Sequence, residues 1–131
     1  MAWMRLMRVY RQVSRAAFCP LRAAGLTTSQ FAVIAKIGAS EGIAQQELAG
    51  SLSVTQGNAS QLLAKLEARG LVIRHQAGRS NRLFLSERGR RLYEEVVPAH
   101  EARISEQFAV LSASERNQLL GLLQKLDRET R

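Results

Sequence analysis

The stretch that decides the fold is residues 45–85, which read QQELAGSLSVTQGNASQLLAKLEARGLVIRHQAGRSNRLFL. Its first half predicts a short helix over residues 45–51 and a longer one from about Thr55 to Arg69, ended by Gly70. Two helices joined so closely must bury a shared seam, for which suitably spaced apolar residues are present: Leu48, Ala49, Leu52, Val54, Ala59 and Leu62. The pattern indicates a helix-turn-helix, although an ordinary helical hairpin would show it too.

The second half of the stretch predicts a β-hairpin. Residues 71–75 and 82–85 are expected to be strands, joined by the six residues from Gln76 to Asn81 with Gly78 in the middle. Arg79 and Arg82 make this hairpin basic. A helix-turn-helix that leads directly into a basic hairpin is much rarer by chance than either part alone, and it favours a winged helix-turn-helix.

Helices are also expected before this stretch. Residues 3–18 have an apolar stripe and a stripe of arginines at helical spacing, and Pro20 and Gly25 are expected to end this helix. A second helix is expected to start at Thr27, where Gln30 completes a capping box. Ile43 is expected to form a one-residue strand.

Two more helices are expected after the hairpin. Ser86 is the expected cap of a long helix, in which Pro98 should cause a kink or mark a restart. A second capping box, Ser112 to Glu115, starts the last helix, whose apolar side chains should face inward: Leu119, Leu122, Leu123 and Leu126. The expected fold is mainly helical with a small β-hairpin.

The charge is unevenly distributed. The 131 residues have a net charge of +8, with +5 in residues 1–26, +6 in residues 53–91 and −2 in residues 92–131. A concentrated basic field favours an anionic partner such as nucleic acid. The acid-free, arginine-rich start would also fit a mitochondrial transit peptide, but a folded helix with one apolar stripe and one arginine stripe explains it better.

Other classes of function have little support. A single cysteine, Cys19, allows no intrachain disulfide and fits a reducing compartment. No apolar run is long enough for a transmembrane helix. His75 and His100 are the only histidines and form no spaced metal site with Cys19. No nucleophile–base pair or phosphate-binding glycine loop is present, so we expect no enzyme, no catalytic residues, no metal and no cofactor.

The chain resembles the MarR family of transcriptional regulators over nearly its whole length. The resemblance is strongest in residues 25–31, 46–49 and 66–72, and continues through the wing, residues 85–89 and residues 111–115. It implies one domain over residues 1–131. Residues 1–26 and 98–131 would be dimerisation helices, and residues 27–97 a winged lobe with its linking helix.

The resemblance also implies partners and a location. It implies a homodimer that binds a palindromic operator on double-stranded DNA, acting as a repressor in the bacterial cytoplasm, where it would be associated with the nucleoid when bound. Small aromatic or phenolic anions would bind between the dimer base and the winged lobe and release the DNA. The Arg stripe of the first helix could pair with acids near the C-terminus: Glu94, Glu95, Glu101 and Glu106.

The residues expected to contact DNA lie on the second helix of the motif and on the wing: Thr55, Gln56, Gly57, Asn58, Ser60, Gln61, Lys65, Arg74, Arg79, Ser80, Asn81 and Arg82. No Arg or Lys lies between positions 55 and 64, so base contacts would depend on amides and hydroxyls, which suit adenine. Gly57 indicates either close approach of the backbone to DNA or simple tolerance of glycine in a first turn.

Two departures from the family pattern concern the wing and the first motif helix. Ala77 and Ser80 stand where acids usually flank the main wing arginine, which predicts that Arg79 is mobile or held by another group. Ala44 replaces the usual serine before the short helix and cannot cap it.

Two alternative functions stay open. Cys19, near Arg15 and Arg22, could make the chain a redox-responsive regulator. Alternatively, the winged fold could serve protein contacts as an architectural or interaction module, although the basic residues 53–91 argue against this.

Overall fold

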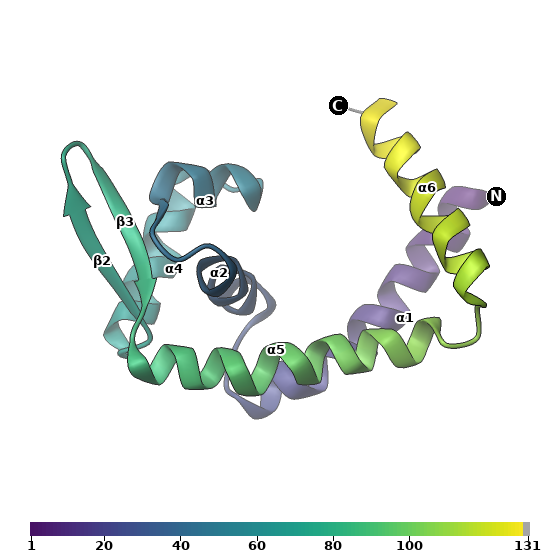
Figure 1. The fold of residues 1–131 in the computed structure, drawn as a ribbon, viewed down its shortest axis with the longest axis horizontal. Coiled ribbons are helices and arrows are strands. Elements are labelled where there is room, and N and C mark those ends of the chain that lie inside the picture. The colour runs from purple at the N-terminus through teal and green to yellow at the C-terminus, as the bar shows by residue number, and fades with distance from the viewer. Residues whose placement is uncertain (130–131) are drawn as a thin grey trace.

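The computed structural model describes residues 1–129, which form six helices and one small sheet (Figure 1). The elements follow in the order α1 (Ala2–Ala23), α2 (Thr28–Ala39), β1 (Ile43–Ala44), α3 (Gln45–Ser51), α4 (Gln56–Ala68), β2 (Val72–Ala77), β3 (Ser80–Leu85), α5 (Glu87–Phe108) and α6 (Ala113–Glu129). The fold is mainly helical with a small β wing, as the sequence predicts.

Figure 1 shows how these elements divide the molecule. Helix α5 runs along the base and carries the lobe of α2, α3, α4 and the hairpin at one end. Helix α1 packs along α5, and α6 rises at the opposite end of α5 from the wing. The described part of the chain is therefore a winged lobe joined by one long helix to an arm made from both terminal regions.

The hydrophobic core lies in the lobe. Buried residues occur from Ala17 to Val96, and the largest fully buried side chains come from the end of α1, from α2, α3 and α4, and from the sheet: Leu21, Val33, Ile34, Ile37, Leu48, Leu63, Leu66 and Leu83. Leu48, Ala49 and Ala59 form the seam of α3 and α4 as expected. Leu52, Val54 and Leu62 are only half-buried, and Leu63 is the fully buried leucine of that turn of α4.

Local hydrogen bonds define the expected helix starts. Thr27 and Gln30 form a reciprocal capping box at α2, and Ser112 and Glu115 form another at α6. Ser86 accepts a hydrogen bond from the Gly89 amide at the start of α5. Each cap satisfies backbone donors that a helix start otherwise leaves unpaired.

The expectation for Pro20 needs correction. Helix α1 does not end at Pro20 but continues to Ala23, because the next residue, Leu21, is anchored in the core with 2% exposure. Burial of that turn outweighs the hydrogen bond that proline cannot donate. Pro98 lies inside α5, as expected, and of the two expected alternatives, a kink or a restart, the restart does not occur.

The wing strands are longer than the sequence predicts. The two strands pair from Val72–Leu85 to Ala77–Ser80, so the loop is the two residues Gly78 and Arg79 rather than six. Gly78 has φ +64, a left-handed conformation that suits the first position of a tight hairpin turn. The ends of the two strands next to the turn extend beyond the core into solvent. Because their residues are mostly polar, the sequence alone predicts a loop there. Ile43 and Ala44 add a third, two-residue strand beside β3.

Candidate nucleic-acid interface

Helix α4 presents a polar face to solvent. The cap Thr55 accepts a hydrogen bond from the Asn58 amide at 3.1 Å, which fixes the start of the helix. Burial of Ala59, Leu63 and Leu66 turns the opposite side of the helix outward. We call this outward side the reading face; it consists of Gln56, Gly57, Asn58, Gln61 and Lys65, all exposed, with Ser60 half-buried at its edge.

Gly57 is not required by the fold. A Cβ added at this position would meet no atom closer than the Thr55 hydroxyl, at 4.0 Å. The backbone there is helical, so a side chain would cause no strain. The free space in front of Gly57 therefore allows another molecule to approach the backbone of α4 closely.

The wing presents Arg79 at its tip. Arg79 is exposed in the two-residue turn. Within residues 1–129 it forms no hydrogen bond or ion pair, so its guanidinium is available to an external anion. Arg82 is exposed as well, and its guanidinium donates to the Gly42 carbonyl at 3.3 Å.

A small polar hollow joins the wing to the helix-turn-helix. It has a volume of about 180 Å³ and lies between the starts of α3 and α4 and the wing tip. Its lining consists of Gln45, Gln46, Gln56, Arg79, Ser80 and Asn81. Gln45 and Gln46 were not among the residues predicted from the sequence, because only the fold brings the start of α3 next to the wing.

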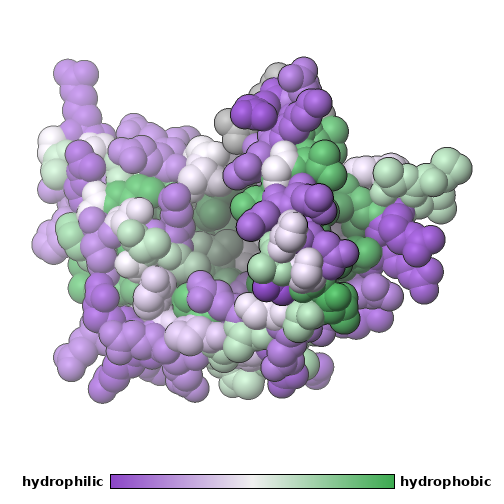
Figure 2. All heavy atoms as spheres, turned by 45° about the vertical axis from the view of Figure 1, so that its right-hand side comes forward, coloured by the Kyte–Doolittle hydropathy of each residue, from purple (hydrophilic) through white to green (hydrophobic). Residues whose placement is uncertain are grey.

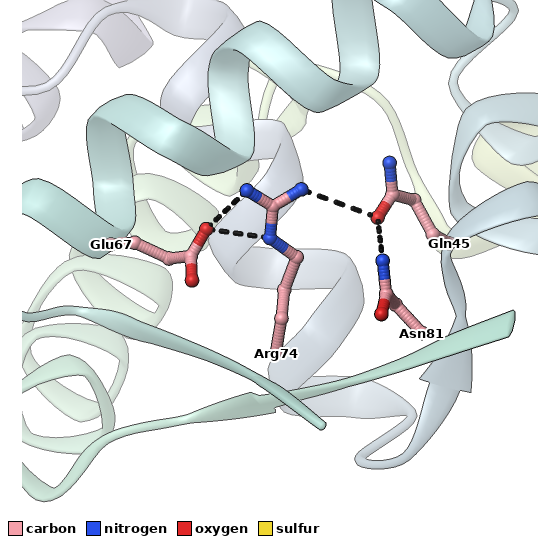
Figure 3. A network of polar contacts seen from close by, with 4 residues as sticks. All are labelled: Gln45, Glu67, Arg74 and Asn81. Atoms are coloured by element: carbon pink, nitrogen blue, oxygen red, sulfur yellow. Dashed lines mark hydrogen bonds and ion pairs between the residues drawn. The ribbon is translucent and has the colours of Figure 1, made fainter. Parts of the chain in front are cut away.

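Arg74 has partners inside the protein (Figure 3). Its Nε donates to Glu67 Oε1 at 2.5 Å, and its Nη2 lies 2.5 Å from the same oxygen. Its Nη1 lies 3.5 Å from Gln45 Oε1, which also accepts a 3.3 Å hydrogen bond from Asn81 Nδ2. The structure thus does not place Arg74 with the exposed residues of the reading face.

Arginines at the base of the lobe also hold the fold together. Arg69 donates to the Gly25 carbonyl at 3.0 Å, and Arg88 donates to the Arg69 carbonyl at 3.3 Å. Arg90 forms an ion pair with Glu41, whose other oxygen accepts a hydrogen bond from the Leu85 amide. These contacts join α5 and β3 to the segments that follow α1, α2 and α4.

The other expected features can be placed as well. Cys19 is exposed on α1. Within residues 1–129 no group of three or more His, Cys, Asp or Glu side chains could hold a metal ion. No helix in that range is both long and apolar enough to cross a membrane. Ala44 gives α3 no side-chain cap.

The terminal helices leave hydrophobic side chains exposed. Helix α6 has no buried residue in the described chain, and several of its leucines are exposed: Leu120, Leu122, Leu123 and Leu126. Helix α1 exposes Trp3, Met4, Leu6, Val9, Tyr10 and Phe18. Figure 2 shows hydrophobic patches among hydrophilic residues at the end of the molecule that is turned toward the viewer. Within residues 1–129, Leu122 and Leu123 of the face expected to point inward are therefore exposed to solvent.

The lobe, with a polar reading face beside a basic two-stranded wing, defines a winged helix-turn-helix protein of the DNA-binding class. Residues 24–82 match the model of the MarR family. A helix-turn-helix transcriptional regulator of Bacillus cereus is 33% identical over 129 residues, which cover 98% of this chain and 88% of the relative. The chain belongs to the MarR family of transcriptional regulators.

Two solved structures of similar proteins contain DNA. The Mycobacterium tuberculosis MarR family protein Rv2887, in complex with DNA, is 28% identical, with a TM-score of 0.78 and coverage of 96% of this chain and 97% of that one. The repressor CouR, bound to a 23-mer duplex, is 26% identical, with a TM-score of 0.85 and coverage of 97% and 92%. These likenesses agree with a DNA-binding transcriptional regulator.

Proposed function

We propose that the protein is a homodimeric, sequence-specific repressor that binds an inverted-repeat operator through α4 and the wing. The observation that carries this proposal is the pairing of an exposed amide-rich reading face with a free arginine at the wing tip. Amides on α4 would contact base edges in the major groove. Arg79 would enter the adjacent minor groove or contact its phosphates.

The amide-rich composition of the reading face predicts the kind of operator. Asn58, Gln56 and Gln61 supply paired donors and acceptors that match adenine, and Lys65 is the only cation on this face. We therefore expect A·T pairs at the major-groove positions. Lys65, Arg82 and the hydroxyls of Thr55, Ser60 and Ser80 would contact the backbone.

The exposed terminal helices support the dimer. Leaving a leucine side chain in water forgoes about 1.5–3 kcal/mol of burial free energy, and α6 exposes Leu122 by 67% and Leu120 by 55%. A second copy packed on α1 and α6 would cover these side chains. Two-fold symmetry of such a dimer would place two lobes on two half-sites, which is why the operator is expected to be an inverted repeat.

Capture of bound genomic DNA tests this function. Chromatin containing the tagged protein is cross-linked, and the captured fragments are sequenced. We expect an enriched inverted repeat near the start of one or a few genes, with derepression of those genes when the regulator is deleted. Fragments with no shared motif would contradict specific regulation and favour the architectural alternative.

A second hollow supports release by a small anion. It has a volume of about 250 Å³, lies where the α1–α2 turn meets α4 and α5, and is lined by Arg69, Arg88 and Arg91 with Leu92 and Glu95. Arginines beside apolar side chains suit an aromatic carboxylate. Titration of the protein–operator complex with salicylate tests this, with Arg91→Ala as the variant expected to resist release.

The exposure of Cys19 favours a second mode of release, by oxidation. A sensor thiol must be accessible to the oxidant. If this mode operates, peroxide releases DNA from the wild type and not from Cys19→Ser. Equal release from both proteins, or from neither, would remove Cys19 from the mechanism.

A further inference from the structure

We propose that Gln45 is a phosphate-contacting residue and that Arg74 is its positioning residue rather than a DNA contact. The inference rests on the proposed DNA-binding function and assigns a role to the four-residue network of Figure 3. That network joins the first residue of α3, the last turn of α4 and both wing strands through Gln45, Glu67, Arg74 and Asn81.

The first step is the orientation of the Gln45 amide. The guanidinium of Arg74 has only donors, so the Gln45 atom that faces it must be the oxygen. The same oxygen accepts from Asn81 Nδ2 at 3.3 Å. With Oε1 held by two donors, Nε2 points away from the network, as Figure 3 shows. The two N–H donors of Nε2 have no acceptor among residues 1–129.

The surroundings of Gln45 suit an anion. Gln45 lines the hollow between the starts of α3 and α4 and the wing tip, together with Gln46, Gln56 and the free guanidinium of Arg79. None of the described residues that line this hollow has a carboxylate side chain. A concave site with amide donors and one cation fits a phosphate oxygen, and the first helix of a helix-turn-helix is the one that crosses the DNA backbone.

The third step is the role of Arg74. Two of its nitrogens are bound to Glu67, and its third points to Gln45. Its side chain is only 23% exposed and its charge is balanced by Glu67 at 2.5 Å. Because the two charges of this ion pair offset each other, Arg74 contributes little net charge to neutralise a phosphate. Instead, the planar guanidinium of Arg74, which Glu67 anchors on α4, fixes the amide of Gln45. Through Gln45 it also fixes the position of the wing strand that carries Asn81.

The test uses the full-length protein and two duplexes of equal length, one selected from a random library by the wild type and one of unrelated sequence. Affinities are measured across a range of salt concentrations for the wild type, Gln45→Ala, Arg74→Gln and the double variant. Gln107→Ala, an exposed glutamine on α5, is the matched control and is expected to bind as the wild type does.

We expect Gln45→Ala to lose about tenfold in affinity, the typical effect of one hydrogen bond to a charged group. The loss should be equal on both duplexes, because a phosphate contact is independent of sequence. Arg74→Gln should show a similar loss, and the double variant should lose no more than either single variant. None of the three should change the slope of log affinity against log salt.

Several results would overturn the inference. A slope reduced by about 0.9 in Arg74→Gln would show that Arg74 itself neutralises a phosphate. Losses that add in the double variant would show that the two residues act independently. Full affinity in Gln45→Ala, or a loss confined to the selected duplex, would exclude a phosphate contact by Gln45.

Arg74→Lys is a second variant that tests the inference even if Arg74→Gln does not fold. Lysine keeps the charge but cannot hold Glu67 and Gln45 with one planar fork, so we expect it to lose affinity as Arg74→Gln does. Retained affinity would indicate a simple charge contact and contradict the inference. Failure of the proposed function would differ from failure of this inference. If binding were not sequence-specific, the wild type would bind both duplexes equally. The affinity of Gln45→Ala for the unrelated duplex would still show whether Gln45 contacts a phosphate.

Discussion

The α-carbon of Gly89, in the first turn of α5, lies against the carbonyl oxygen of Leu71, at the start of the wing. A Cβ added to Gly89 would overlap this oxygen, which also accepts a 3.0 Å hydrogen bond from the Ser86 amide. The obstruction is backbone, so it cannot be relieved by a side-chain rotation. The wing and the long helix are therefore joined at a point where only glycine fits.

Gly89→Ala is expected to lower the free energy of unfolding by about 1–3 kcal/mol, because the backbones of α5 and β2 must move apart. Chemical denaturation measures this change. Gly50→Ala is the matched control, since a Cβ there meets nothing within 4 Å, and it should leave stability equal or up to about 1 kcal/mol higher. A Gly89→Ala protein as stable as the wild type would show that the joint can widen freely.

Gly57→Ala is expected to separate folding from DNA binding. The added methyl group has room in the free protein, so thermal stability should be unchanged or slightly higher. If the backbone of α4 approaches DNA closely, affinity for the selected duplex should fall about tenfold or more. Unchanged affinity would show that Gly57 is simply tolerated in the first turn.

Arg79→Ala is expected to weaken operator binding by about 1–3 kcal/mol through loss of the wing-tip contact. Arg79 has no partner within residues 1–129, so stability and oligomeric state should not change. Titration of labelled duplex at physiological salt measures the effect, with gel filtration as the control. Undiminished affinity would exclude the wing tip from the interface.

Leu122→Asp is expected to dissociate the proposed dimer, because it places a charge on the exposed hydrophobic face of α6. Sedimentation velocity at micromolar concentration should show a monomer with the helical content of a folded lobe. Gln124→Asp, a substitution two residues further along the same helix, should remain a dimer. A wild type that sediments as a monomer would contradict the dimer itself.

The stability of the protein should fall as the pH decreases through the range in which His100 titrates. Partial burial lowers the pKa of His100 below 6.5, with Glu101 opposing the shift, and its ring lies 4.5 Å from that of Phe31. The unfolded chain therefore binds a proton at a higher pH than the folded protein does, and protonation favours unfolding. The cost is absent well above pH 6.5 and grows as the pH falls below it.

Denaturation of the wild type and His100→Gln at a series of pH values measures this effect. The wild type should lose stability more steeply than the variant on acidification. His75→Gln, which alters an exposed wing histidine, should keep the steep dependence. Parallel curves for the wild type and His100→Gln would show that the burial of His100 has no consequence for folding.

Much of the fold is decided locally and was predictable from the sequence. The caps at Thr27, Thr55, Ser86 and Ser112 bond to amides three residues away, so a short window of sequence contains both partners. The seam of α3 and α4 follows from apolar spacing in the same way. These features were enough to predict a winged helix-turn-helix and the reading face of α4.

Only the tertiary structure decided the features that depend on distant partners. Helix α1 continues past Pro20 because Leu21 is buried in the core. The wing strands are longer than expected because β2 and β3 remain paired as far as Ala77 and Ser80, outside the core. Arg74 meets Gln45 across 29 positions of the chain. The sequence places Arg74 in the first wing strand, and only the fold brings its guanidinium against Glu67 of α4. The sequence by itself determined which surface is polar and basic, and packing determined which of its side chains are free to bind.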